Sequence, residues 1–308
     1  MASQQFDPEM YTKMMCLTSA YRLSPYPALE SAQNTAAGKH ILITGASRGL
    51  GAQMAKSWAA GGAAGVAICA RSASSLEAVA GELKAINPDV DVLAQACDTT
   101  KPEEVEKLFL AAKKQFGKLD VVIANVGVAT TTSPEDSKIG VQDPEVWWNQ
   151  VTSNIRSTHL TAHYFVKTFG PDPTGTCIIM TSGAAAIIPP GLSAYGMTKQ
   201  ACIRITEYLD VEYPKLRCFA VDPGIVKGLA TMEQYKPFAV VEPEVVGQFS
   251  VWLGSDRADG CRGGYVHVAW DVQELEEKAD EIKEKGLVKS KFLSGVLGQE
   301  GGALGKKE

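Results

Sequence analysis

Short apolar runs alternate along this chain with longer segments in which apolar residues return every three or four positions. In the segment 102–116, for example, Val105, Leu108, Ala112 and Phe116 share one face of a predicted helix. The apolar runs predicted to form strands are 41–44, 65–70, 90–96, 119–124, 176–181, 216–221 and 265–268. Repeated alternation of strand and helix is typical of βαβ units, which place parallel strands side by side. The pattern therefore predicts an α/β protein with a doubly wound parallel sheet of about seven strands and helices on both faces.

The predicted sheet belongs to a single domain. No linker rich in Gly, Ser or Pro divides residues 38–271. We expect residues 1–37 to form an N-terminal arm that packs on this domain, and residues 272–308 to form a C-terminal helix and tail. Within that tail, the charged stretch 274–285 predicts a solvated helix, and residues 286–308 are expected to be frayed.

Composition narrows the classes of partner. The 308 residues include 30 Lys and Arg against 35 Asp and Glu, which gives a net charge of −5 and a pI of about 5.5. This balance leaves no broad basic surface for a phosphate backbone, so nucleic acid is not an expected partner. A hydrophobic content of 45%, a charged content of 21% and a mean hydropathy of −0.04 indicate an ordered globular protein without a membrane span.

The seven cysteines are scattered and include no CxxC pair. Several lie inside predicted strands, so we interpret them as small buried hydrophobic residues in a reducing compartment. Residues 1–37 contain Asp7, Glu9, Pro25 and Pro27 and lack the uninterrupted apolar stretch of a secretory signal. A cytoplasmic location is therefore expected.

A glycine-rich turn follows the first predicted strand. The segment Thr44 to Gly51 reads Thr-Gly-Ala-Ser-Arg-Gly-Leu-Gly and places Gly45, Gly49 and Gly51 where the next helix begins. Glycines at these positions allow the backbone to approach a pyrophosphate at the helix N-terminus. Three glycines in a turn also arise for conformational reasons alone, but the preceding strand and the following amphipathic segment favour a dinucleotide site.

Two arginines indicate which dinucleotide the turn prefers. Arg71 lies twenty residues after Gly51, at the end of the second predicted strand, where an acidic residue would bind a free ribose 2′-hydroxyl. An arginine there favours the 2′-phosphate of NADP. Arg48 within the turn is a candidate second cation, with an ordinary solvated arginine as the alternative.

The segment Tyr195-Gly-Met-Thr-Lys199 places a phenol and an ammonium four residues apart, on one face of a helix. A phenol has an ordinary pKa of about 10, so a Tyr that transfers protons near neutral pH needs a positive charge beside it. A Tyr and a Lys at this spacing are common in helices. Ser182, thirteen residues earlier at the end of a predicted strand, makes a chance arrangement a poor explanation.

Taken in order and spacing, these segments resemble the short-chain dehydrogenase/reductase family. The landmarks are Thr44 to Gly51, Ala124-Asn-Val-Gly127, Asn154, Ser182, Tyr195, Lys199 and Asp222-Pro-Gly224. The resemblance runs from about Lys39 to Asp271 and is specific, because seven landmarks from separate segments fall where the family has them. It implies a single Rossmann-like domain and an NADP(H)-preferring member with N- and C-terminal extensions.

The resemblance also implies catalytic roles. Tyr195 is the general acid in reduction, and Ser182 orients the substrate carbonyl. Lys199 holds the ribose hydroxyls and favours the Tyr195 phenolate, while Asn154 anchors a water in the proton relay.

Further positions match residues that contact the cofactor in this family. Asp98 corresponds to the position beside adenine, although an Asp at a strand end is also a common helix cap. Asn125 and Gly127 match the motif that steadies the sheet. The full cofactor-binding set is Gly45, Ser47, Arg48, Gly49, Leu50, Gly51, Arg71, Asp98, Asn125, Gly127, Tyr195, Lys199, Pro223, Gly224 and Val226.

The chain departs from the family pattern at two positions. Val126 stands where the family commonly has a smaller Ala, which predicts an altered ribose wall. Gly228 stands where the family usually has a Thr that binds the nicotinamide amide, and Thr231 would replace it only if the loop folds back.

Three other features have plainer interpretations. His159 and His163 lack a third ligand, so we predict no metal site. Trp147 and Trp148 are expected to pack on the sheet or on a neighbouring subunit. The segment 229–241 is either a substrate lid suited to a hydrophobic substrate or an ordinary packed loop.

These observations lead to one main hypothesis. The chain is predicted to be an NADP(H)-dependent oxidoreductase that interconverts a carbonyl and an alcohol on a hydrophobic small molecule, in secondary or lipid metabolism. By the resemblance, it is also expected to form a homodimer or homotetramer. The alternatives are a dehydratase, epimerase or cyclase of the same fold with bypassed redox chemistry, and a non-catalytic NADP-sensing regulatory protein.

Overall fold

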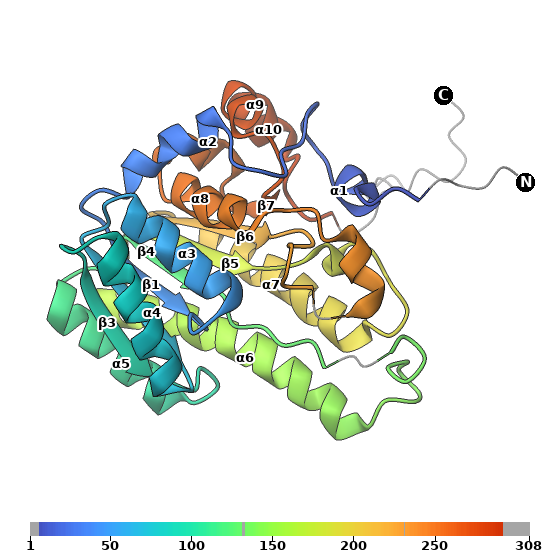
Figure 1. Cartoon of the computed structure of the whole chain (residues 1–308), viewed down its shortest axis with the longest axis horizontal. Helices are drawn as coiled ribbons and strands as arrows, with labels where there is room; N and C mark the ends of the chain where they lie inside the picture. Colours follow the sequence, from blue (N-terminus) through green and yellow to red (C-terminus); the bar gives the residue numbers. More distant parts are fainter. Residues whose placement is uncertain (1–5, 131–132, 231, 292–308) are drawn as a thin grey trace, which may run out of the picture.

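The computed structural model describes residues 6–130, 133–230 and 232–291. Its centre is one seven-stranded parallel sheet in the order β3-β2-β1-β4-β5-β6-β7 (Figure 1). The strands are β1 (His40–Thr44), β2 (Gly65–Ala70), β3 (Asp91–Ala96), β4 (Val121–Ala124), β5 (Gly175–Met180), β6 (Leu216–Asp222) and β7 (Gly264–His267). This architecture confirms the predicted doubly wound α/β fold. The strand order reverses between β1 and β4, which is where open α/β sheets bind ligands.

Helices connect and cover the strands. The α-helices are α1 (Met10–Met14), α2 (Pro27–Ser31), α3 (Gly49–Ala60), α4 (Ala73–Ile86), α5 (Pro102–Phe116), α6 (Pro144–Phe169), α7 (Ser193–Glu212), α8 (Pro243–Leu253), α9 (Val272–Glu277) and α10 (Ala279–Lys285). Short 3-10 helices are η1 (Ala32–Ala36), η2 (Gly183–Ala185), η3 (Glu233–Phe238) and η4 (Asp256–Cys261). Figure 1 shows α6 and α7 on one side of the sheet and α2 and α8 on the other.

The sheet separates two hydrophobic cores because successive residues of a strand point to opposite faces. Ile41 and Ile43 of β1 belong to the core formed with α3, α4 and α8. Leu42, between them, belongs to the core formed with α5, α6 and α7. Both faces of β1 are therefore buried, which explains why this strand reads as an uninterrupted apolar run.

The N-terminal arm packs on the first of these faces. Leu29 of α2 and Ala32 and Ala36 of η1 are fully buried in the core beside α8. Nearer the N-terminus, Arg22 Nε lies 2.6 Å from an Asp271 carboxylate oxygen. The arm is thus fixed to the C-terminal part of the chain as well as to the sheet domain.

The C-terminal segment differs from the expected solvated helix and frayed tail. Two short helices replace the single helix, with Lys278 between them outside helical geometry (φ −107°, ψ 17°). Val288 is buried, and its carbonyl accepts a hydrogen bond from the Tyr265 amide at 2.8 Å. Residues 286–291 are therefore packed against β7, while residues 292–308 lie outside the described residues.

All seven cysteines lie within the described ranges, and all are free thiols. Six are buried, as the sequence predicts, and Cys16 in the arm is partly exposed. Burial raises the pKa of the Cys177 thiol to about 12, so that thiol stays protonated at neutral pH. Over the same ranges, no helix combines the length and apolar character needed to cross a bilayer.

Candidate active site

The glycine turn after β1 has a backbone that only glycine adopts readily. Gly45 and Gly49 have positive φ values of 67° and 60°. A β-carbon on Gly51 would lie 2.5 Å from the Gly45 carbonyl oxygen, so the turn and the start of α3 are in direct contact. Arg48, the residue before α3, makes no capping hydrogen bond with its side chain. The first amides of α3 therefore remain available to an anion.

Asn125 fixes the turn to the neighbouring strand. Its side-chain amide donates hydrogen bonds to the carbonyl oxygens of Thr44 and Gly45 at 2.9 and 3.2 Å. Its backbone amide donates to Thr44 Oγ1 at 3.0 Å. Val126 packs against the same turn, because a β-carbon on Gly45 would lie 3.0 Å from Val126 Cγ2. The loop after β4 therefore shapes the turn, and the bulkier Val126 forms part of that shape.

Three of the predicted cofactor contacts, at this edge of the sheet, are charged. Arg48 and Arg71 are exposed, and neither forms an ion pair among the described residues. Asp98 accepts hydrogen bonds from the amide and hydroxyl of Thr100 at 3.0 and 2.8 Å. Burial acts to raise the pKa of Asp98, but these hydrogen bonds, with the charges of Lys101 and Arg71, leave it lowered. Asp98 is therefore an ionised acceptor beside an unpaired arginine.

The predicted catalytic side chains come from three elements. Ser182 follows β5, and its Oγ accepts a hydrogen bond from the Ala184 amide at 3.3 Å. Tyr195 and Lys199 lie one helical turn apart on α7, and Lys199 Nζ is 5.6 Å from the centroid of the Tyr195 ring. Lys199 is only 3% exposed and donates to the Met180 carbonyl at 2.9 Å. The ammonium is therefore held behind the phenol, on the protein side of the site.

Asn154 connects three parts of the site. Its side chain exchanges hydrogen bonds with the backbone of Val128, accepting at 2.8 Å and donating at 3.0 Å. It also donates to Thr198 Oγ1 on α7 at 3.0 Å. The residue is 1% exposed, so it holds the loop after β4 and α7 together from within the protein.

Asp222, Tyr265 and His267 form a cluster of polar side chains at the ends of β6 and β7. Asp222 accepts hydrogen bonds from the Gly224 amide at 2.9 Å and from the Tyr265 hydroxyl at 2.6 Å. His267 Nε2 lies 4.0 Å from Asp222, and His267 Nδ1 accepts from the Ala269 amide at 3.0 Å. Burial, followed by the charge and hydrogen bond of Asp222, raises the pKa of Tyr265 well above its ordinary value. These partners fix the Pro223-Gly224 turn where the site needs it.

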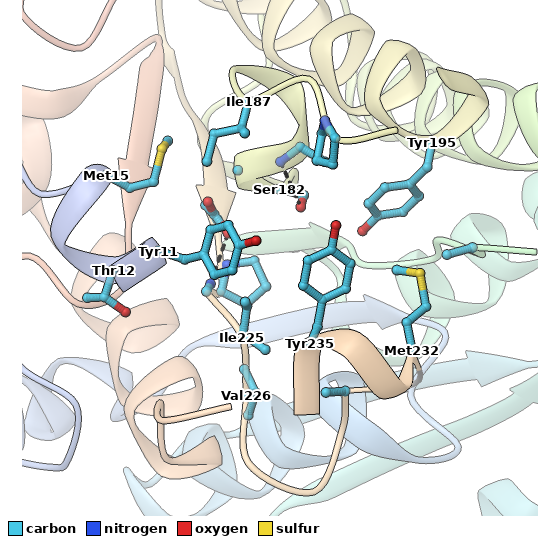
Figure 2. Close-up of a pocket in the computed structure, with 18 of the residues that line it drawn as sticks. Tyr11, Thr12, Met15, Ser182, Ile187, Tyr195, Ile225, Val226, Met232 and Tyr235 are labelled. Carbon is cyan, nitrogen blue, oxygen red and sulfur yellow. Dashed lines mark hydrogen bonds between the residues drawn. The ribbon is translucent and has the colours of Figure 1, made fainter. Parts of the chain in front are cut away.

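These elements surround a pocket of about 260 Å³. Ser182 and Tyr195 line it together with the predicted cofactor residues Leu50, Pro223, Gly224 and Val226. Most of the remaining wall is apolar and includes Met15, Ala129, Ile187, Leu192, Ile225 and Met232. Figure 2 shows the Ser182 and Tyr195 hydroxyls pointing into this space. The arrangement can hold a carbonyl oxygen of an apolar molecule against two hydroxyl groups.

The segment predicted to be a lid or a packed loop lines this pocket. Leu229, Ala230 and Tyr235 contribute to its wall. Gly228 has a φ of 72°, and a β-carbon there would meet no atom of the described residues within 4 Å, so it faces open space. Thr231, the candidate replacement for the family threonine, lies outside the described residues.

Sequence reasoning missed one group of pocket residues. Tyr11 and Thr12 of α1 and Met15, the residue after α1, line the pocket, although the arm was expected only to pack on the domain. The aromatic and methionine content of the arm was the available signal, but nothing in its spacing indicates a partner. Trp147, expected to pack on the sheet or on a neighbouring subunit, donates a hydrogen bond to Ser193 Oγ at the start of α7 at 3.0 Å.

The two histidines on α6 pack against each other. The His159 and His163 rings stack with centroids 5.8 Å apart. In the part of the chain that the structure describes, no three His, Cys, Asp or Glu side chains are placed to hold a metal ion.

Comparison with known proteins identifies relatives of this chain. Residues 39–237 match the family model described as short chain dehydrogenase. The short chain dehydrogenase pigC of Monascus ruber is 32% identical over 290 residues, which cover 90% of this chain and 94% of that protein.

Two solved structures with bound dinucleotides are also similar. The 3-ketoacyl-(acyl-carrier-protein) reductase of Brucella melitensis, complexed with NADH, has a TM-score of 0.67 and 27% identity, covering 76% of this chain and 97% of that one. The alcohol dehydrogenase of the archaeon Thermococcus sibiricus, complexed with 5-hydroxy-NADP, has a TM-score of 0.60 and 28% identity, covering 70% and 89%.

Proposed function

The chain belongs to the short-chain dehydrogenase/reductase family, and from that premise we propose that it interconverts a carbonyl and an alcohol on a hydrophobic small molecule with NADP(H). One observation carries the proposal. Ser182 and Tyr195 line the same largely apolar pocket, and the buried Lys199 ammonium lies behind the Tyr195 ring. The apolar wall also supports a role in secondary or lipid metabolism.

The residues present fit a dinucleotide. Gly51 has no room for a side chain beside the Gly45 carbonyl, and the uncapped N-terminus of α3 offers amides to a pyrophosphate. Gly45, Ser47, Gly49 and Leu50 complete this turn. When bound, the nicotinamide supplies the hydride in reduction and accepts it in oxidation.

The side chains of the pocket manage the substrate oxygen and its proton. Ser182 donates a hydrogen bond to the carbonyl oxygen and stabilises the negative charge that develops there. Tyr195 transfers its phenolic proton to that oxygen in the reductive direction. The charge of Lys199 favours the resulting phenolate. Asn154, which ties α6 to the loop after β4, remains our proposed anchor for the water that returns the proton.

A preference for NADP(H) is supported by the two unpaired guanidinium groups. Arg71 follows β2 and Arg48 lies in the glycine turn, so both are free to pair with a 2′-phosphate. Asp98, ionised at the end of β3, is the proposed partner for the adenine. One similar structure holds an NADP derivative and another holds NADH, so structural similarity favours neither cofactor. The preference for NADP(H) is therefore proposed from the two arginines alone.

The experiment that tests this function needs no known substrate at its start. Purified protein is titrated with NADPH and with NADH while nicotinamide fluorescence is followed, and the tighter cofactor is then used with a panel of hydrophobic ketones. We expect tighter binding of NADPH and oxidation of NADPH by part of the panel. Failure to bind either cofactor favours bypassed redox chemistry. Tight binding without turnover favours an NADP-sensing regulatory protein.

We also propose that the chain pairs through α6 and α7. These helices line a hollow that includes His159, His163 and Tyr208, and Tyr208 is 61% exposed. A homodimer or homotetramer formed through α6 and α7 would bury this hollow. Light scattering after size exclusion tests the proposal, and a monomer at micromolar concentration would refute it.

A further inference from the structure

One wall of the pocket comes from the N-terminal arm. Tyr11 of α1 and Met15, the residue after α1, line the pocket together with Ser182 and Tyr195 (Figure 2). Bonds outside the pocket hold the arm in place. The Met15 carbonyl accepts a hydrogen bond from Trp270 Nε1 at 2.7 Å, and Tyr21 pairs with Trp270 in an antiparallel bridge.

Aromatic contacts join the arm to η3. The Tyr11 ring packs edge-on against Phe238 and Tyr235, with centroid distances of 4.9 and 5.8 Å. Phe6 packs against Phe238 from the other end of the cluster, at 5.3 Å. An edge-on contact fixes the relative orientation of two aromatic rings, because the positive edge of one ring meets the negative face of the other. The Tyr11 and Tyr235 rings are therefore positioned without the use of their hydroxyl groups.

The two hydroxyl groups point into the pocket. Figure 2 shows the hydroxyls of Tyr11 and Tyr235 directed toward the space that the Ser182 and Tyr195 hydroxyls also face. Neither the Tyr11 nor the Tyr235 hydroxyl has a hydrogen-bond partner among the described residues. Both rings are half-buried, and sheltered phenols in proteins usually have a partner.

Two other polar side chains of the same pocket already have partners. Asp222 accepts from Gly224 and Tyr265, and His267 Nδ1 accepts from Ala269. Burial raises the pKa of Tyr235, so its hydroxyl keeps its proton at neutral pH and can both donate and accept a hydrogen bond. The pocket thus has the hydroxyls of Tyr11 and Tyr235 in addition to those of Ser182 and Tyr195.

We propose that Tyr11 and Tyr235 bind a second oxygen of the substrate, a hydroxyl or carbonyl group set apart from the reacting carbonyl on an apolar framework. The substrate class is therefore an oxygenated hydrophobic ketone or its alcohol rather than a plain hydrocarbon ketone. This inference rests on the proposed function for the position of the reacting carbonyl. It assigns substrate selection to the arm and to η3.

The test uses matched probes. α-Tetralone derivatives carry either a hydroxyl or a methyl group at the same aromatic position, because these groups are similar in size and differ in hydrogen bonding. Dissociation constants for the complex with NADP⁺ are measured by calorimetry, and kcat/KM is measured with NADPH. Wild type is compared with Tyr11→Phe, Tyr235→Phe, the double variant and Tyr21→Phe. Tyr21 lies on the same arm, and its hydroxyl donates to Glu9 outside the pocket.

Wild type is expected to bind the best hydroxylated isomer about tenfold more tightly than its methyl counterpart, as two hydrogen bonds would give. Each single Phe variant should lower this preference about threefold, the double variant should remove it, and Tyr21→Phe should keep it. The phenylalanine rings retain the aromatic packing, so the variants test the hydroxyls alone.

Two results would overturn the proposal: no preference in wild type, or an unchanged preference in the double variant. Tyr195→Phe separates this question from the proposed function, because it should abolish turnover and leave the binding preference in place. If wild type binds with the expected preference but reduces no probe, the redox proposal fails while the recognition by Tyr11 and Tyr235 stands.

Discussion

A β-carbon on Gly127 would lie 2.9 Å from Nζ of Lys199. The same ammonium donates to the Met180 carbonyl at 2.9 Å, so it occupies a narrow space between the ends of β4 and β5. This space exists because Gly127 has no side chain. The position of the Lys199 charge behind Tyr195 therefore depends on a glycine at residue 127.

Gly127→Ala is therefore expected to displace the Lys199 ammonium and to lower kcat about tenfold or more, because the proton transfer by Tyr195 loses its supporting charge. Steady-state kinetics with NADPH and a reduced ketone measure this effect. Gly81→Ala is the matched control, since none of the described atoms would lie within 4 Å of a β-carbon there and an alanine inside α4 should raise the free energy of unfolding by about 0.5–1 kcal/mol. Wild-type kcat in Gly127→Ala would show that the ammonium position does not limit the reaction.

Tyr195→Phe removes the proposed proton donor and keeps the ring beside Lys199. We expect turnover to fall at least about a hundredfold, while the dissociation constant for NADPH stays within about twofold because the glycine turn is untouched. Single-turnover absorbance and fluorescence titration measure the two quantities. Retained turnover would refute the role of Tyr195 as general acid.

The sheet was predictable because its signal is local, and the candidate catalytic set could be proposed from the sequence for the same reason. Buried strands such as β1 and β5 read as apolar runs, and the spacing from Tyr195 to Lys199 is fixed by one turn of helix. The link between Tyr11 and Phe238 was not predictable. It joins segments 227 residues apart through ring packing, and no periodicity in either segment encodes such a contact. The break between α9 and α10 at Lys278 was equally invisible, because the charged pattern 274–285 continues through it.

Arg71→Ala should weaken NADPH binding about tenfold and leave NADH binding unchanged, because a charge-assisted hydrogen bond to the 2′-phosphate is lost. Arg48→Ala should act in the same direction. Fluorescence titrations with both cofactors provide the comparison. Arg156→Ala, exposed on α6, is the control for the loss of one positive charge. An equal loss of affinity for NADPH and NADH would remove the 2′-phosphate role from Arg71.

His267 makes the free energy of unfolding depend on pH. Burial lowers the pKa of His267, although the Asp222 carboxylate acts to raise it. The unfolded chain, with an ordinary His pKa of about 6.5, then binds a proton that the folded chain does not. This contribution is constant above pH of about 6.5, and stability is lost as the pH falls below that value toward the lower pKa of the folded state.

His267→Gln removes this titration and keeps an acceptor for the Ala269 amide. Urea unfolding at a series of pH values between neutral and mildly acidic should show a smaller loss of stability for the variant than for wild type. Parallel curves for the two proteins would contradict the assignment.

The contacts of the arm also set an order of assembly during synthesis. The Ser19 amide donates to Glu274, and Arg22 pairs with Asp271, across separations of 255 and 249 residues. The arm is synthesised about 250 residues before these partners, so the contacts form only after the partners have been translated and the long intervening loop has closed, at an entropy cost. The glycine turn needs only partners up to Asn125 for its own hydrogen bonds. A nascent chain can therefore complete its glycine turn long before the arm can form its part of the pocket wall.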